Sequence, residues 1–261
     1  MLLISSAANA RFKTLKKLCS HNRSRQEARL MVLDGVHLLQ SLLDCGSTPQ
    51  TVVLSEPALE HAEIRPLLAR LSGVETLLLS EALFGQLSEL PSATGILALC
   101  SLPAAHALPQ PHEQRIVLLD GVQDPGNVGS ILRTAAAAGV DAVLLSADCA
   151  DPWSPKTLRA GMGAHFAVRV VAQADLLACL DHFKGNVVGT TLDAPANVYQ
   201  TDLRGSLAWL FGAEGQGVRP ALQARCTTRV RIPMPGKVES LNVAAAAAIC
   251  LFEQLRQNLH P

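Results

Sequence analysis

Short apolar runs alternate with longer mixed stretches along the part of the chain that follows residue 113. The runs are rich in valine and leucine and end in glycine or polar residues, which is typical of buried strands. The stretches between them have apolar residues at helical spacing, and strands separated by helices imply parallel pairing. The expected strands cover residues 115–122, 141–147, 165–171, 186–192, 207–212 and 227–233, and the expected helices cover 127–138, 156–162, 174–183, 220–225 and 241–259.

The first hundred residues show the same two patterns in a less regular order. Residues 26–44 have apolar positions at helical spacing, so we predict one helix there. Three further apolar runs predict strands, at residues 51–55, 74–80 and 95–100. A mixture of this kind is expected of a small α/β domain.

The composition changes over residues 101–113, where three prolines would stop helices and remove strand donors. A domain linker is expected there. At 261 residues the chain is also longer than a typical single domain of about 100–150 residues. We therefore predict an α/β protein with a smaller domain over residues 1–103 and a parallel-sheet domain over residues 113–261.

The charge of the chain is balanced overall, with 22 basic and 22 acidic residues, so any contact with a nucleic acid must be local. Residues 11–33 contain seven basic residues and one acidic residue, a net charge of +6. This run could contact phosphates, although a solvated helix face is the more common explanation. Aromatic residues are only 3% of the chain, which argues against a stacking platform for single-stranded RNA.

The cysteines and histidines suggest neither a disulfide framework nor a metal site. The chain has seven cysteines, an odd number without a CxxC pair, and its histidines are not clustered. The longest apolar run, residues 243–252, is shorter than the roughly 18 residues that a membrane span needs. We expect a cytoplasmic protein without a metal or a membrane partner.

The first segment with chemical potential is residues 120–139, where a strand ends in Asp124, Pro125 and Gly126 and a helix with Asn127 and Arg133 follows. Parallel α/β proteins bind ligands at such strand-to-helix turns, where free amides and the helix dipole point at the site. An ordinary turn with a helix N-cap explains the segment equally well. The glycine patterns of dinucleotide and triphosphate sites are absent.

Two later segments combine irregular backbone with isolated polar residues. In residues 211–218 a strand leads into three glycines around Glu214, and glycine allows a ligand to approach the main chain closely. Residues 231–248 form a strand, a proline-containing loop and a helix start at Ser240 and Asn242. Ser240 is predicted to cap that helix, and each segment taken alone is compatible with a purely structural role.

The three segments together read DPxNxGxxxR, GxEGxG and IPMxGxxESLNV, and in this order they resemble the SpoU (TrmH) branch of the SPOUT RNA methyltransferases. Residues 1–100 resemble, more loosely, the RNA substrate-binding domain of L30e-like type that often precedes this catalytic domain, including the pattern LPSATGILA at 90–98. The resemblance implies a deep trefoil knot in the C-terminal domain and a homodimer with its active site near the subunit interface.

The resemblance also implies a cofactor, S-adenosyl-L-methionine, and the residues of the site. The cofactor would lie against six residues and the reaction would depend on five others, of which Arg133 is the key one. The family proposal makes Arg133 the base, but a guanidinium seldom gives up its proton. We therefore expect Arg133 to bind the RNA phosphate and orient the hydroxyl, while a phosphate oxygen or a briefly deprotonated arginine accepts the proton. The cofactor-binding residues are Thr190, Gly212, Gly217, Ile232, Met234 and Leu241, and the catalytic residues are Asn127, Arg133, Glu214, Ser240 and Asn242.

The reaction that the resemblance implies is methylation of a ribose 2′-hydroxyl, with a guanosine of ribosomal RNA as the expected substrate. Three alternatives stay open. The substrate could be the ribose of a transfer RNA, the acceptor could be a base nitrogen, or the protein could be a non-catalytic RNA-binding or ribosome-assembly protein that kept the fold.

Overall fold

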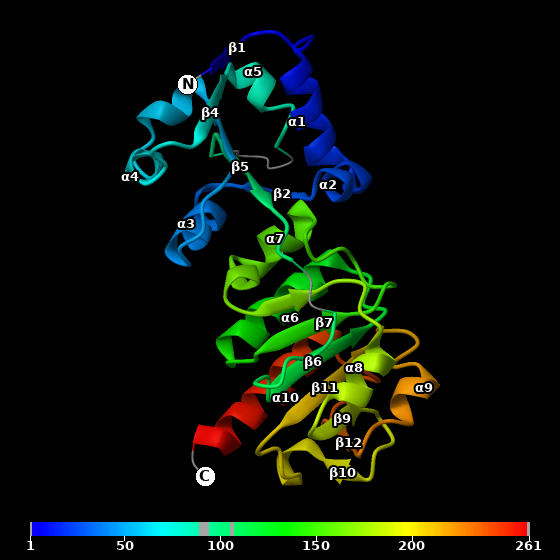
Figure 1. Cartoon of the computed structure of the whole chain (residues 1–261). Coiled ribbons are helices and arrows are strands. Elements are labelled where there is room, and N and C mark those ends of the chain that lie inside the picture. Colours follow the sequence, from blue (N-terminus) through cyan, green and yellow to red (C-terminus); the bar gives the residue numbers. More distant parts are fainter. Residues whose placement is uncertain (1, 89–93, 105–106, 260–261) are drawn as a thin grey trace. The chain divides into compact units, whose positions relative to one another are not determined.

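The structure is a computed structural model that describes residues 2–88, 94–104 and 107–259. The chain forms two compact units, each with a sheet of its own (Figure 1). One unit consists of residues 1–103 and 153–166, and the other of residues 104–152 and 167–261. The pattern at 90–98 begins in residues 89–93, outside the described part of the chain.

The N-terminal unit is built on a mixed sheet of five strands in the order β1-β4-β3-β5-β2, in which β2 and β3 run antiparallel to β5. The core below it comes from α1, α5 and the inward side chains of the strands. The elements are β1 (Leu2–Ile4), α1 (Ala10–Ser20), α2 (Asn22–Ala28), β2 (Leu30–Asp34), α3 (Val36–Asp44), β3 (Thr51–Ser55), η1 (Glu56–Glu60), α4 (Ile64–Ala69), β4 (Glu75–Leu79), α5 (Glu81–Phe84) and β5 (Ile96–Ser101).

The single helix predicted over residues 26–44 is wrong, because strand β2 divides that stretch into α2 and α3. Arg29 adopts a left-handed conformation with φ 55° and ends α2, and Gly35 with φ 108° separates β2 from α3. The run from Leu30 to Asp34 pairs antiparallel with β5, some 65 residues later in the chain. A partner so distant in sequence leaves no trace in local periodicity. The strands predicted at 51–55, 74–80 and 95–100 are confirmed.

The C-terminal unit contains an all-parallel sheet of seven strands in the order β10-β12-β9-β11-β6-β7-β8. The predicted parallel α/β architecture is therefore confirmed, and β10 is an addition to it. The strands are β6 (Arg115–Asp120), β7 (Ala142–Leu145), β8 (Arg169–Val171), β9 (Asn186–Thr190), β10 (Ala196–Asn197), β11 (Leu207–Gly212) and β12 (Thr228–Arg231); the helices are α6 (Pro125–Ala137), α8 (Leu176–His182), η3 (Val198–Gln200), α9 (Pro220–Gln223) and α10 (Val243–Leu259).

One predicted helix groups with the other unit. Helix α7 (Pro155–Gly161) and the short η2 (Ala164–Phe166) lie between β7 and β8 along the chain, but they belong to the unit formed by residues 1–103. Within that unit α7 packs against β2. The first part of the strand predicted over 165–171 is the end of η2, so β8 is shorter than its apolar pattern.

Helices cover both faces of the seven-stranded sheet (Figure 1). Alternate strand residues face α8 and α9 in one core, which includes Leu118, Leu210, Leu180 and Leu222. The residues between them face α6 and α10, and there the buried indole of Trp209 donates a hydrogen bond to Gln254 Oε1 at 2.9 Å. Because both faces are buried at β6, β7 and β11, these strands are apolar at successive positions.

The order of the strands reverses between β6 and β11. From β6 the chain crosses to β7 and β8 on one side, whereas β9, β11 and β12 lie on the other side. In the register of this central pair, Asp120 stands opposite Gly212 at the carboxyl ends of both strands. Ligands of open parallel sheets bind beyond the carboxyl ends of the strands at such a reversal. The functional site is therefore expected next to Asp120 and Gly212.

A membrane-spanning helix is not found in the described part of the chain, because none of its helices is both long and apolar enough.

Candidate functional site

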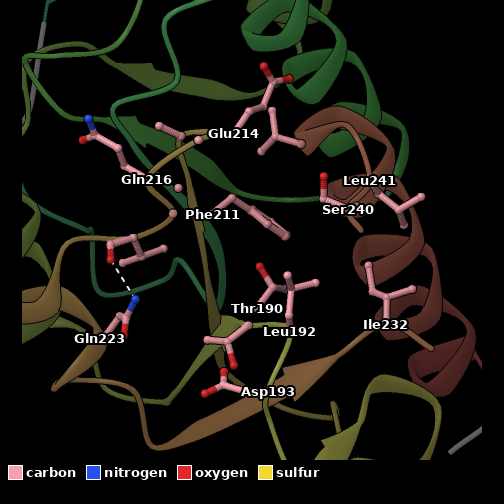
Figure 2. A pocket seen from close by; sticks show the side chains of 18 of the residues that line it. Thr190, Leu192, Asp193, Phe211, Glu214, Gln216, Gln223, Ile232, Ser240 and Leu241 are labelled. Atoms are coloured by element: carbon pink, nitrogen blue, oxygen red, sulfur yellow. Dashed lines mark hydrogen bonds between the residues drawn. The ribbon is translucent and has the colours of Figure 1, made fainter. Parts of the chain in front are cut away.

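A cavity of about 420 Å³ opens at the carboxyl ends of β9, β11 and β12 (Figure 2). Its volume lies within the range of roughly 300–1,000 Å³ that is usual for small-molecule sites. All six residues predicted to bind a cofactor line this cavity. Its lining consists of Thr190, Thr191, Leu192, Asp193, Phe211, Gly212, Ala213, Glu214, Gly215, Gln216, Gly217, Val218, Gln223, Ile232, Met234, Ser240, Leu241, Val243 and Ala246.

At one end of the cavity, side chains from the three segments meet in a hydrogen-bonded cluster. Asn127 Nδ2 donates to Glu214 Oε1 at 2.6 Å. Asn242 Nδ2 donates both to the same Glu214 oxygen and to Asn127 Oδ1, each at 2.9 Å. The two amides therefore hold one carboxylate from two sides. Figure 2 shows Glu214 at this end of the cavity and Asp193 at the other.

The start of each neighbouring helix fixes one member of the cluster. Asp124 Oδ1 accepts the backbone N–H of Asn127 at 2.8 Å and so caps α6, and Pro125 occupies the first turn. Asn242 Oδ1 accepts the N–H groups of Ala244 and Ala245 at the start of α10. The prediction that Ser240 caps this helix is wrong, because α10 begins at Val243 and Asn242 is its N-cap. Ser240 is an exposed residue of the cavity lining.

Two glycines allow the loop after β11 to fold back on itself. A Cβ on Gly212 would lie 2.1 Å from the carbonyl carbon of Gly217, which is backbone and cannot move aside. Gly217 has φ 66°, in the left-handed region, and its N–H donates to the carbonyl of Ala213 at 2.8 Å. The close turn presents main-chain groups of the loop to the cavity and points Glu214 toward Asn127.

The charges of the cavity select against phosphate-containing ligands. Asp193 and Glu214 are the charged residues of its described lining, and that lining contains no lysine, arginine or histidine. A nucleoside phosphate would be repelled there, whereas a positively charged ligand would be attracted. The hydroxyl of Thr191 is buried and has no hydrogen-bond partner in the described chain, so a bound ligand could satisfy it. These features fit S-adenosylmethionine, which carries a sulfonium and an ammonium group.

Two of the five predicted catalytic residues lie outside the cluster: Ser240, which lines the cavity, and Arg133, which is part of neither the cluster nor the cavity lining. Arg133 lies on α6, is exposed and lacks a hydrogen bond or an ion pair with the described residues. Its position six residues after Asn127 places it on another side of the helix. The side chain is therefore free to contact a molecule from outside this unit.

Several lining residues were not predicted from the sequence. Thr191, Leu192 and Asp193 follow β9 directly, and Phe211 is the second-last residue of β11. Thr191 and Asp193 are polar residues directly after a buried parallel strand, where ligands of α/β proteins bind. This position is a signal in the sequence from which Asp193 could have been predicted. Phe211 reads as an ordinary core residue in the sequence.

Asn242 has two roles, as the N-cap of α10 and as a donor to Asn127 and Glu214, and two substitutions separate them. We expect Asn242→Ala to lower the free energy of unfolding by about 1 kcal/mol, because the N-cap of α10 is lost. Asn242→Ser should change the free energy of unfolding by only a few tenths of a kcal/mol, since serine can cap but cannot donate to both Asn127 and Glu214. Denaturant unfolding of both variants checks this. Equal destabilisation by alanine and serine would contradict the assignment of Asn242 as the cap.

Comparisons with known proteins match both parts of the chain to RNA methyltransferases and their substrate-binding domain. Residues 114–252 match the SpoU rRNA Methylase family, and residues 9–98 match the MRM3-like substrate binding domain. The chain is 32% identical to the 23S rRNA (guanosine(2553)-2'-O)-methyltransferase RlmP of Bacillus subtilis over 97% of this chain and 98% of that protein. It is also 42% identical to the 23S rRNA (guanosine-2'-O-)-methyltransferase RlmB of Xanthomonas campestris, over 55% of this chain and 59% of that protein.

Solved structures agree in fold over nearly the whole chain. The crystal structure of an RNA 2'-O ribose methyltransferase matches with a TM-score of 0.83 and 32% identity, covering 99% of this chain and 100% of that one. The SpoU methyltransferase AviRb of Streptomyces viridochromogenes, solved in complex with AdoMet, matches with a TM-score of 0.87 and 28% identity, covering 97% and 99%. The chain belongs to the SpoU rRNA methylase family.

Proposed function

We propose that the protein transfers the methyl group of S-adenosylmethionine to the ribose 2′-hydroxyl of a guanosine in 23S ribosomal RNA. The observation that carries the proposal is the cluster of Asn127, Glu214 and Asn242 at the end of a cavity whose charges favour a cationic ligand. RlmP, which aligns over almost the full chain, is named for this reaction on 23S rRNA, and AviRb was solved with AdoMet. An enzyme of this kind would act in the cytoplasm.

The cofactor would be held largely by main-chain groups. Thr190, Gly212, Ile232, Met234 and Leu241 line the cavity from the ends of three strands and the loop before α10, and Gly217 shapes the turn beside them. When bound, S-adenosylmethionine supplies a methyl group on a sulfonium centre. The carboxylates of Asp193 and Glu214 favour that positive charge over neutral or anionic ligands.

The acceptor hydroxyl must be held in line with the methyl group and must lose its proton as the new O–C bond forms. Arg133 would grip the phosphate next to the target ribose with two parallel hydrogen bonds and so fix the hydroxyl. A guanidinium keeps its proton under nearly all conditions, so the proton would pass either to a phosphate oxygen or to an arginine that is deprotonated only briefly. Ser240, Asn242, Asn127 and Glu214 would keep the loop and the ribose in register.

The substrate RNA would also bind the N-terminal domain. Of the seven basic residues in the run over residues 11–33, Arg25 is buried and donates to the carbonyl of Leu18 at 3.1 Å. The other six, Arg11, Lys13, Lys16, Lys17, Arg23 and Arg29, are exposed. Arg11 pairs with Glu75 and Arg23 pairs with Glu27, so the local positive charge available to a phosphate backbone comes mainly from Lys13, Lys16, Lys17 and Arg29.

The proposal includes a homodimer and a trefoil knot in the C-terminal domain, residues 113–261. Helix α10 exposes two large apolar side chains, Phe252 at 49% and Leu259 at 63%, which supports a contact with a second copy of the chain. A second copy would also explain how Arg133, which stands apart from the cluster, could reach an active site. For the knot, the support is the family match alone.

The experiment that tests the proposal is mass-spectrometric mapping of 2′-O-methylated nucleotides in RNA from cells with and without the gene. We expect one guanosine of 23S rRNA to lose its ribose methyl group in the deletion strain and to regain it when the gene is restored. Loss of a methyl group from a transfer RNA instead would identify the alternative substrate, and an unchanged methylation pattern would contradict the proposal.

A further inference from the structure

A second cavity, of about 690 Å³, lies behind the loop that forms one wall of the cofactor cavity. Residues 213–217 line both cavities, so one loop separates them. The second cavity opens at the carboxyl ends of β6 and β11, where the strand order reverses. This is the position at which parallel sheets bind ligands, and the cofactor cavity lies to one side of it. A cofactor in the first cavity would therefore leave the second cavity, at the point where the strand order reverses, open to another molecule.

The charges around the second cavity disfavour an RNA phosphate. Four carboxylates line it, and Arg219 is the one basic residue of its described lining. A phosphate group would meet a net negative charge there, whereas neutral groups with N–H donors would be attracted. Nucleobases are neutral and carry such donors on their edges. The acidic residues are Asp120, Asp124, Asp148 and Glu214.

Arg219 is held in place by a buried carboxylate. Asp120, whose side chain is 2% exposed, lies 2.7 Å from Arg219 Nη2 and accepts the backbone N–H of Arg219 at 2.8 Å. The hydrogen bond to Asp120 raises the pKa of Arg219, so the guanidinium stays charged. The side chain of Arg219 is nevertheless 55% exposed and lines the cavity. Its remaining N–H groups form a positioned donor, which is the usual partner of guanine O6 and N7.

Asp148 supplies an acceptor next to that donor. Its Oδ2 lies 3.8 Å from Arg219 Nη1, beyond hydrogen-bond distance, and its side chain is 68% exposed. The carboxylate therefore keeps both oxygens free for a ligand. Two oxygens of one carboxylate match two adjacent N–H donors, and a guanidinium beside them matches an oxygen acceptor. Guanine has both features on neighbouring positions, with N1–H and the 2-amino group beside O6.

We propose that the second cavity binds the base of the target guanosine, with Asp148 accepting from N1–H and the 2-amino group and Arg219 donating to O6. The inference rests on the proposed function and deepens it, because it assigns the residues that select guanosine. Adenine, cytosine and uracil each lack N–H donors on two adjacent ring positions. None of them can therefore donate two hydrogen bonds to Asp148 while accepting one from Arg219. Glu214 lines both cavities, so the ribose of a guanosine bound in the second cavity would lie beside it, close to the cofactor.

Asp148→Asn tests the assignment without changing the size of the side chain. The amide keeps one oxygen for N1–H but turns an NH₂ group toward the 2-amino group. Asp181→Asn is the matched control, since it removes an exposed carboxylate of α8 outside both cavities. The substrates are two synthetic RNAs with the sequence around the mapped guanosine, one with guanosine and one with inosine, which lacks the 2-amino group. Calorimetry with S-adenosylmethionine reports on fold and cofactor site.

We expect the wild type and Asp181→Asn to methylate the guanosine RNA about 10-fold or more faster, in kcat/KM, than the inosine RNA. In Asp148→Asn this preference should disappear or reverse, while cofactor affinity stays that of the wild type. Equal methylation of both RNAs by the wild type, or an unchanged preference in Asp148→Asn, would overturn the base pocket but leave the proposed reaction standing. Failure of the wild type to methylate either RNA would overturn both.

Discussion

Replacing Arg133 with alanine is expected to lower the rate of methyl transfer by about 1,000-fold or more, because positioning of the acceptor can lower the activation barrier by several kcal/mol. The dissociation constant for S-adenosylmethionine should change by less than about twofold, since Arg133 does not line the cofactor cavity. Its side chain is exposed and makes no hydrogen bond or ion pair with the described residues, so the variant should also fold normally. Single-turnover transfer and calorimetry measure the two quantities separately.

Two further variants sharpen the test of Arg133. Arg133→Lys keeps the charge but loses the planar pair of donors, so it should recover only a small part of the rate. Arg229→Ala removes an exposed arginine of β12 that lies outside the cofactor cavity, and it should transfer methyl groups like the wild type. Full activity in Arg133→Ala would refute the role of this residue.

Gly212→Ala is expected to abolish cofactor binding. The new Cβ would stand 2.1 Å from the carbonyl carbon of Gly217 and 2.3 Å from Val218 N, and both are backbone atoms of the opposite side of the turn. Overpacking usually destabilises a protein by about 1–3 kcal/mol, and we expect a cost of about 3 kcal/mol or more here because the backbone cannot move aside. About 3 kcal/mol lost from the binding site would raise the dissociation constant more than about 100-fold.

Gly215→Ala provides the control for Gly212. A Cβ at Gly215 would meet nothing within 4 Å, and this residue has no left-handed φ. The variant should therefore bind S-adenosylmethionine nearly as the wild type does, although it lies in the same loop. Calorimetry measures the affinity of both, and circular dichroism reports whether each is folded. A folded Gly212→Ala with wild-type affinity would show that the turn does not shape the cavity.

The sequence predicted the C-terminal sheet well because both of its faces are buried. Strands β6, β7 and β11 are therefore continuous apolar runs, and the helices between the strands have apolar residues at helical spacing. The N-terminal prediction failed at residues 26–44, where pairing with β5 overrides a helical pattern. Sheet partners that lie far apart in sequence cannot be read from local periodicity.

The site was predictable in its residues and not in its geometry. The three motifs named Asn127, Glu214 and Asn242, which the structure joins by hydrogen bonds. The sequence did not show that Asn242 rather than Ser240 caps α10, because both residue types are good caps and only the helix start decides. Asp148 was not predicted either, because only the structure shows that it lies beside Arg219, where the strand order reverses.

The central claim is that the cavity and the cluster beside it join a sulfonium methyl group to a ribose oxygen. The most direct test incubates the purified protein with 23S rRNA from the deletion strain and S-adenosylmethionine that carries a trideuterated methyl group. Mass spectrometry of the digested RNA should find the deuterated methyl group on the ribose 2′-oxygen of one guanosine. A label on a base nitrogen, or no label in RNA while the cofactor binds, would contradict the account.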